Sequence, residues 1–239
     1  MTAFPVLEEN MRSIMIIEKA LFGEQTPETA QRRREVIKVI KKKKQKATES
    51  YLRYGRDYFD NPDIIEGYRK YRYDGRYEPY AENIIKEFNL SKGSRILELG
   101  CAKGFILKEF QDKGMHVYGV DVSKYAVEKC HPDVREKVTL ASGESLDFKD
   151  QSIDFLICKD VLSHISFDSI DKALSEINRV TRGTVYLEIP CGKTGIELEN
   201  LRLWDPTYQI INTPEWWKKL IEKYKFNSIV YFKILIPEL

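Results

Sequence analysis

From residue 95 onward, the sequence alternates short apolar segments with segments whose apolar residues recur every three or four positions. Short apolar segments bounded by turn residues predict buried strands, whereas the longer period predicts amphipathic helices. Strands and helices that alternate along a chain form a mostly parallel sheet with helices on both faces. We therefore predict a doubly wound α/β domain. Its expected strands are residues 95–99, 116–120, 138–141, 153–158, 184–189 and 228–236.

Residues 1–92 follow a different pattern and are predicted to form a helical extension ahead of the α/β domain of residues 93–239. Thr26–Pro27 has the form of a helix cap followed by proline, and it should begin a long basic helix that includes Lys41–Lys44. Glycines then divide a tyrosine-rich stretch into short pieces. An earlier helix is predicted over residues 6–22 from apolar residues at helical spacing, namely Leu7, Met11, Ile14, Ile17 and Leu21.

Composition narrows the function classes. The 239 residues carry a net charge of +2, which gives no overall field for binding a polyanion. No apolar run is long enough to cross a membrane, and the first residues do not resemble a signal peptide. The four cysteines are scattered without a C-x-x-C pair. We therefore expect reduced thiols in a cytoplasmic protein, no membrane association and no metal site.

One segment carries the residues that point to a ligand. Glu98, Gly100 and Gly104 stand where the first strand of the α/β domain ends and a helix begins. Glycines there let the backbone approach a ligand closely, and in open α/β sheets ligands lie beyond the carboxyl ends of the strands. Asp121 ends the next strand, where its carboxylate can accept both ribose hydroxyls of an adenosine. The dinucleotide pattern G-x-G-x-x-G does not fit, since two of its three glycines are replaced, at positions 102 and 105.

Ile96–Gly104 resembles motif I of the class I methyltransferases that depend on S-adenosylmethionine (SAM). Ala102 replaces the middle glycine of that motif, which we expect to be tolerated with a negative φ. Three further stretches are similar to later motifs of this family and follow in the same order: Tyr118–Ser123, Ala141–Phe148 and Ile153–Ile165. The resemblance implies a Rossmann-like fold that binds SAM. The usual fold ends with a sixth strand and an antiparallel seventh, and residues 228–239 leave little room for both, so we expect one edge strand to be missing.

The resemblance also implies which residues contact the cofactor. Glu98 would support the site or meet the methionine amino group, and Asp121 would hold the ribose. The loop Gly100–Gly104, with Cys101 and Ala102, would pack against the methionine. The other expected contacts are Val122, Ser142, Gly143 and Glu144 around the adenine, Lys159 near the sulfonium, and Tyr73 and Arg76 in a lid over the methionine carboxylate.

Methyl transfer from a sulfonium is an in-line displacement in which positioning supplies most of the rate, and a base helps when the nucleophile is a hydroxyl. His164 follows the fourth strand of the α/β domain and is the first candidate base, with a structural role in its loop as the alternative. Asp160 is the second candidate and Glu188 the third. Pro190–Cys191 resembles the nucleophile pair of cytosine C5 methyltransferases, but in the DNA enzymes that pair follows the fourth strand and here it follows the fifth, so a cysteine nucleophile is not expected.

The methyl acceptor is predicted to be a small molecule, such as a sugar or secondary metabolite, methylated on oxygen or nitrogen. Tyr71, Trp204 and Tyr208 are its candidate contacts, with core packing as the alternative. A second hypothesis is an RNA or protein methyltransferase that docks through the basic helix. Nucleic-acid binding is not favoured, because a lysine run is more often the solvated side of a helix. A third hypothesis is a non-catalytic SAM-binding subunit, and a homodimer through the N-terminal helices is a further one.

Overall fold

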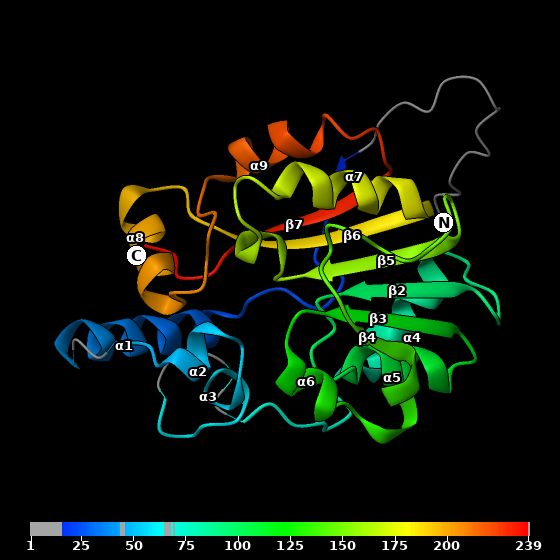
Figure 1. Cartoon of the computed structure of the whole chain (residues 1–239). Coiled ribbons are helices and arrows are strands. Elements are labelled where there is room, and N and C mark those ends of the chain that lie inside the picture. The colour runs from blue at the N-terminus through cyan, green and yellow to red at the C-terminus, as the bar shows by residue number, and fades with distance from the viewer. Residues whose placement is uncertain (1–15, 44–45, 65–67, 69, 239) are drawn as a thin grey trace.

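The computed structural model of the chain describes residues 16–43, 46–64, 68 and 70–238. Its strands are β1 (Ile16–Glu18), β2 (Arg95–Leu99), β3 (His116–Asp121), β4 (Val138–Leu140), β5 (Ile153–Lys159), β6 (Thr181–Cys191) and β7 (Ser228–Ile234). They form one sheet in the order β1-β7-β6-β5-β2-β3-β4 (Figure 1). Each pair of neighbouring strands is parallel, so the predicted doubly wound, mostly parallel sheet is confirmed.

The helices of the described part are α1 (Pro27–Lys43), α2 (Glu49–Leu52), α3 (Arg56–Phe59), α4 (Glu78–Glu87), α5 (Phe105–Asp112), α6 (Lys124–Glu128), α7 (Ile170–Val180), α8 (Gly195–Trp204) and α9 (Pro214–Ile221), with 3₁₀ turns at Pro132–Lys137 and Leu162–His164. The core of one sheet face includes α4 and α5, and that of the other includes α7 and α9. Figure 1 shows α1, α2 and α3 beyond the carboxyl ends of the strands. These three helices therefore stand over the edge where a ligand is expected.

Strand β5 shows why the sequence predicts a sheet covered on both sides. Successive side chains of a strand point to opposite faces. Phe155 and Ile157 belong to the α4–α5 core, whereas Leu156 and Cys158 belong to the α7–α9 core, and all four are fully buried. A parallel strand buried on both faces has a nearly continuous apolar sequence, and residues 153–158 have that pattern.

The N-terminal segment differs from the expectation. Residues 6–15 of the predicted helix over 6–22 lie outside the described residues, and residues 16–22 form β1 and a loop. Ile16 and Ile17 pair in register with Ser228 and Ile229 of β7. The prediction of a missing edge strand is therefore wrong, because β1 occupies that edge, and β7 is parallel where the usual last strand is antiparallel. Ile17 and Leu21 fit a helical spacing, but Ile16 and Ile17 are β-branched, and β-branched residues favour strands.

Within the described ranges, no helix is both long and apolar enough to cross a membrane. The four cysteines are free and buried.

Candidate active site

The loop after β2 bends through backbone conformations that favour glycine. Gly100 and Gly104 both have a φ of 72°, in the left-handed region. A Cβ on Gly104 would lie 2.8 Å from Cγ2 of Val134, so a side chain there would also collide with its neighbours. Ala102 has a φ of 49°, which corrects the expected negative value. Its amide donates a 2.7 Å hydrogen bond to Oδ2 of Asp121, and this bond holds a conformation that costs about 1–2 kcal/mol for an L-residue.

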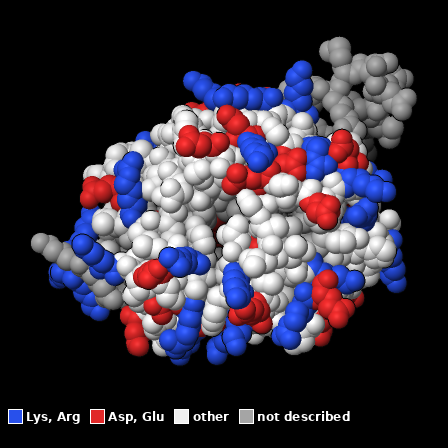
Figure 2. Space-filling view, in the orientation of Figure 1, with Lys and Arg blue, Asp and Glu red and all other residues white. Residues whose placement is uncertain are grey.

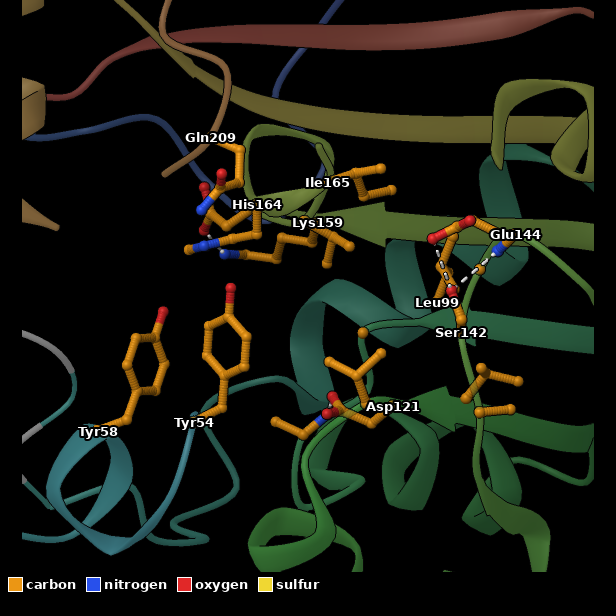
Figure 3. A pocket seen from close by; sticks show the side chains of 18 of the residues that line it. Tyr54, Tyr58, Leu99, Asp121, Ser142, Glu144, Lys159, His164, Ile165 and Gln209 are labelled. Carbon is orange, nitrogen blue, oxygen red and sulfur yellow. Dashed lines mark hydrogen bonds and ion pairs between the residues drawn. The ribbon is translucent and has the colours of Figure 1, made fainter. Parts of the chain in front are cut away.

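A cavity of about 430 Å³ opens beyond the carboxyl ends of β2, β3 and β5 (Figure 3). Asp121 and Glu144 lie toward one end, and Lys159 and His164 lie toward the other. The volume is within the range of roughly 300–1,000 Å³ that is typical of small-molecule sites. Ten residues predicted from the sequence contribute to its wall: Gly100, Ala102, Asp121, Val122, Ser142, Gly143, Glu144, Lys159, Asp160 and His164.

Asp121, at the end of β3, is the acid of the wall nearest the loop. Its Oδ1 accepts the amide of Ser123 at 2.8 Å, and its Oδ2 accepts that of Ala102. Burial raises the pKa of Asp121, and the two amide hydrogen bonds act in the opposite direction. Because each carboxylate oxygen can accept more than one hydrogen bond, Asp121 still has lone pairs for ligand hydroxyls.

Two predicted lid residues do not contribute to this wall. The ring of Tyr73 packs on His131, with centroids 4.9 Å apart, and also on Phe105. The exposed guanidinium of Arg76 pairs with the carboxylate of Asp74. A local partner two residues away thus holds Arg76, so its predicted role at the methionine carboxylate is not supported by its position.

Three other predicted cofactor residues, Glu98, Cys101 and Gly104, are also absent from the cavity wall. Cys101 is buried, and a Cβ on Gly119 would lie 2.6 Å from its Sγ, so it packs against β3. Glu98 is 4% exposed, and its Oε2 has no hydrogen-bond partner among the described residues. Burial raises the pKa of Glu98 well above its ordinary value, although Lys159 opposes this. A buried carboxyl with one oxygen unsatisfied is costly, and an amino group of a ligand would satisfy it.

A cluster of four charged groups lies toward the carboxyl ends of β5, β6 and β7. Lys159 contacts Asp160 at 2.6 Å and Glu188 at 3.2 Å, and Lys233 contacts both of the same acids. Burial alone would raise the pKa of Asp160, but the two lysines together hold it well below its usual range. The cluster is balanced, with two cations and two anions, and Asp160 remains ionised.

His164, in the 3₁₀ turn after β5, is held by a polar chain. Its Nδ1 lies 3.0 Å from Oγ1 of Thr207, and Thr207 donates a 2.7 Å hydrogen bond to Oδ1 of Asp205. The hydroxyls of Tyr51 and Tyr58 also donate to Asp205. Burial lowers the pKa of His164, and the nearby acids partly oppose the shift. The imidazole is therefore neutral at pH 7.

A second cavity of about 280 Å³ adjoins the first, and Tyr58, Tyr68, Asp160 and His164 contribute to the walls of both. Two of the predicted acceptor contacts, Trp204 and Tyr208, line this second cavity. The third, Tyr71, lines neither one. The ring centroids of Tyr71 and Phe105 are 4.7 Å apart, and the carbonyl of Tyr71 accepts a hydrogen bond from the ammonium of Lys103. Tyr71 therefore packs the N-terminal layer against α5.

A family model described as "Methyltransferase domain" matches residues 97–189, which span β2 to β6 and include the loop, Asp121 and His164. The chain carries a class I SAM-dependent methyltransferase domain. It is similar to phosphoethanolamine N-methyltransferase 2 of Caenorhabditis elegans, with 32% identity over 116 residues, 42% of this chain and 26% of the relative. It is also similar to magnesium-protoporphyrin O-methyltransferase of Rhodobacter capsulatus, with 24% identity over 101 residues, 41% of this chain and 45% of the relative.

The fold of the methyltransferase domain is also found in solved structures. A SAM-dependent methyltransferase from Archaeoglobus fulgidus superposes with a TM-score of 0.50 at 20% identity, covering 62% of this chain and 68% of that one. The matches to the two curated relatives span between about a quarter and a half of their lengths. The likeness therefore covers the cofactor-binding core.

The cofactor of this methyltransferase domain is SAM, and the residues present fit it. Asp121 offers free carboxylate lone pairs toward a ribose, and Glu98 holds the unsatisfied oxygen that an amino group would complete. A wall of Val122, Gly143 and Ala141 suits a flat ring. These features lie along one edge of the sheet, in the order in which the cofactor motifs follow in the sequence.

Three tyrosines of the methyltransferase site are not among the residues predicted from the sequence: Tyr54, Tyr58 and Tyr68. Figure 3 shows Tyr54 and Tyr58 reaching up from the α2–α3 segment, with their hydroxyls toward the His164 end of the cavity. The available signal was the tyrosine-rich stretch itself, but its spacing does not tell which rings face the cavity and which pack beneath it.

Proposed function

We propose that this chain transfers the methyl group of SAM to an oxygen or nitrogen of a small molecule. The observation that supports this most is the junction of two cavities at His164 and Asp160. The first cavity has the cofactor residues, and the second has room for a separate molecule. A group placed at the junction would reach the sulfonium methyl from the side of the second cavity.

Bound SAM supplies an electrophilic methyl on a sulfonium, so the protein has to position the acceptor and accept a proton. His164 is suited to the second task because its tautomer is defined. The single hydroxyl hydrogen of Thr207 is donated to Asp205, so Nδ1 of His164 has to donate to Thr207 at their 3.0 Å contact. Nε2 then carries the lone pair, and the neutral ring can act as a general base.

Asp160 and Glu188 are less suited to that role. The two lysines that contact Asp160 lower its pKa, so it binds a proton poorly near neutral pH. Glu188 is 3% exposed and paired with Lys159 and Lys233. We assign both acids to holding the lysines in place, with the ammonium of Lys159 at the wall of the first cavity.

The alternative of docking on RNA or protein through α1 has less support. The apolar side of α1, with Ile37 and Ile40, packs on Leu235 and Ile236 near the C-terminus. Lys41, at its end, lies 3.8 Å from Glu199 of α8. Lys41, Lys42 and Lys43 thus lie exposed at the end of a packed helix. The homodimer hypothesis relied on the helix over residues 6–22, and the described part of that segment forms β1 and a loop instead.

Calorimetric titration with SAM tests the cofactor step. Asp121→Ala should weaken SAM binding at least tenfold, because each hydrogen bond to a charged group contributes about 1.5–3 kcal/mol. Asp121→Asn should weaken it less and reports on folding, since it preserves the side-chain shape. Asp147→Ala removes an exposed carboxylate outside both cavities and should leave binding unchanged. No binding by the wild type, or equal binding after Asp121→Ala, would refute the proposal.

A further inference from the structure

The second cavity joins aromatic rings with basic side chains. Its aromatic residues are Tyr58, Tyr68, Trp204 and Tyr208. Arg32 and Arg33, from the first half of α1, contribute to its wall together with Lys233. Figure 2 shows charged side chains of both signs around the rim of this face, with lysine and arginine among them at the left, where α1 lies, and mostly uncharged side chains around the hollow at its centre.

The acids of this cavity are already satisfied by protein groups. Asp160 is paired with Lys233 and Lys159. Asp205 accepts hydrogen bonds from Tyr51, Tyr58 and both the amide and the hydroxyl of Thr207. Neither carboxylate is therefore available to neutralise an arginine at the other side of the cavity.

The two arginines have no such partner. In the part of the chain that the structure describes, neither Arg32 nor Arg33 forms an ion pair with a carboxylate. Arg33 is half-buried. It is held by the side chain of Gln25 and the carbonyl of Leu235, and its guanidinium lies over the ring of Trp204, 5.7 Å from the centroid. A fixed, partly desolvated cation beside a cavity attracts an anion strongly, and a guanidinium binds carboxylate or phosphate oxygens in pairs.

We propose that the second cavity is the methyl-acceptor site and that it selects small acceptors with a carboxylate or phosphate, held by Arg32 and Arg33. This inference rests on the proposed function and adds the substrate class. The anionic group lies at the α1 side, and the oxygen or nitrogen to be methylated points to His164 at the junction. The four aromatic rings contact the part of the acceptor between these two ends.

The shape of the site favours this class over a macromolecule. The volume of the second cavity, about 280 Å³, lies just below the range of roughly 300–1,000 Å³ that is typical of small-molecule pockets. The acceptor is therefore smaller than the cofactor. A polymer that docked on α1 would depend on the exposed lysines at the end of that helix, whereas a small anion depends on the two arginines in the cavity wall.

Binding of simple anions tests the site without any knowledge of the acceptor. Inorganic phosphate and benzoate are titrated separately into protein saturated with S-adenosylhomocysteine, by calorimetry. At least one of them should bind saturably, and the affinity should fall at least tenfold in the double variant Arg32→Gln/Arg33→Gln. Arg33→Lys separates charge from geometry, and it should bind more weakly than the wild type because an ammonium lacks the planar fork.

The neighbouring arginine provides the matched control. Arg34 is on the same helix, binds Gln31 and the carbonyl of Pro237, and lines neither cavity. Arg34→Gln should bind the anions as the wild type does. Loss of binding in Arg34→Gln equal to that in the double variant, or saturable binding that survives in the folded double variant, would overturn the proposal.

A methyl-transfer assay tests whether the anionic group belongs to the acceptor and whether it is a phosphate or a carboxylate. Ethanolamine is compared with phosphoethanolamine, and phenol with 4-hydroxybenzoate, so that each pair differs only in the anionic group. The anionic member of at least one pair should be methylated with the higher kcat/KM, and the Arg32→Gln variant should reduce that preference at least tenfold. Methylation of neutral members alone, with SAM binding intact, overturns the acceptor class and leaves the proposed function standing. Absence of SAM binding overturns the proposed function itself.

Discussion

A Cβ on Gly100 would lie 2.1 Å from Cγ2 of Val161. The loop after β2 therefore packs directly on the residue that follows Asp160, at the end of β5. This contact ties the cofactor loop to the turn that carries His164. The left-handed φ of Gly100 and the absence of a side chain are both needed for the two loops to lie so close.

Gly100→Ala should therefore destabilise the fold and weaken SAM binding. The positive φ costs about 1–2 kcal/mol for alanine, and forcing a methyl against Val161 adds about 1–3 kcal/mol. Gly93→Ala is the matched control, because Gly93 has a φ of 84° but a Cβ added there would meet nothing within 4 Å. Denaturant unfolding should show the larger loss for Gly100→Ala, and equal losses would mean that the contact with Val161 relaxes freely.

His164→Ala should keep its affinity for SAM and lose turnover by about 10²–10⁴-fold, the usual contribution of a general base. Calorimetry gives the first quantity and a methyl-transfer assay with an accepted substrate gives the second. Unchanged turnover would mean that His164 is not the general base and has a structural role in its loop.

Thr207→Val separates positioning from proton transfer. It leaves the imidazole in place but removes the acceptor at Nδ1, so the proton is free to move to Nε2. Turnover should fall by at least tenfold with little change in KM, and Thr207→Ser should restore it, since serine retains the hydroxyl. Equal defects in the serine and valine variants would contradict the polar chain.

The buried histidine should also make stability depend on pH. Burial lowers the pKa of His164 in the folded protein below its ordinary 6.5, so the unfolded chain binds its proton first as pH falls. The stabilisation is therefore complete above the unfolded pKa and is lost as pH falls through the folded one. Between pH 7 and 5, the free energy of unfolding should fall less steeply in His164→Gln than in the wild type. His116→Gln, at an exposed position, controls for the loss of one histidine, and a slope change equal to that of His164→Gln would exclude this explanation.

The pairing of β1 can be tested at Lys19. Its amide donates to the carbonyl of Val230 at 3.0 Å, and Lys19→Pro removes the donor. Leaving that buried carbonyl without a partner costs about 1–3 kcal/mol. Lys19→Ala keeps the backbone amide and loses only the ion pair with Glu87, in which the side chain of Lys19 is 46% exposed. This variant should lower the free energy of unfolding by at most about 1 kcal/mol. Similar unfolding curves for the two variants would argue against the strand.

The sequence was most informative where local pattern and burial agree. Strands β2 and β5 are apolar on both faces, and the acid at the end of β3 has only one edge of the sheet to occupy, so the place of Asp121 at the cavity wall could be predicted. The N-terminal strand was not foreseen, because pairing of Ile17 with Ile229 is a long-range contact that no local spacing encodes. The ion pair between the guanidinium of Arg76 and the carboxylate of Asp74 is likewise not visible from the sequence, because a spacing of two residues does not show which way either side chain points. Tyr71 and Tyr208 were both candidate acceptor contacts, and only the structure shows that Tyr71 packs on Phe105 whereas Tyr208 lines the second cavity.

The position of β1 has a consequence for how the chain folds. Among the described strands, β1 is the first to be synthesised and pairs only with β7, which is the last. β1 therefore has no partner strand until β7 has been synthesised, when the other described strands of the sheet have already been made. Closing so large a loop is entropically slow. We therefore expect the two isoleucines of β1 to stay exposed until β7 is made, and docking of this segment, together with α1, to be a late event that completes the wall of the second cavity.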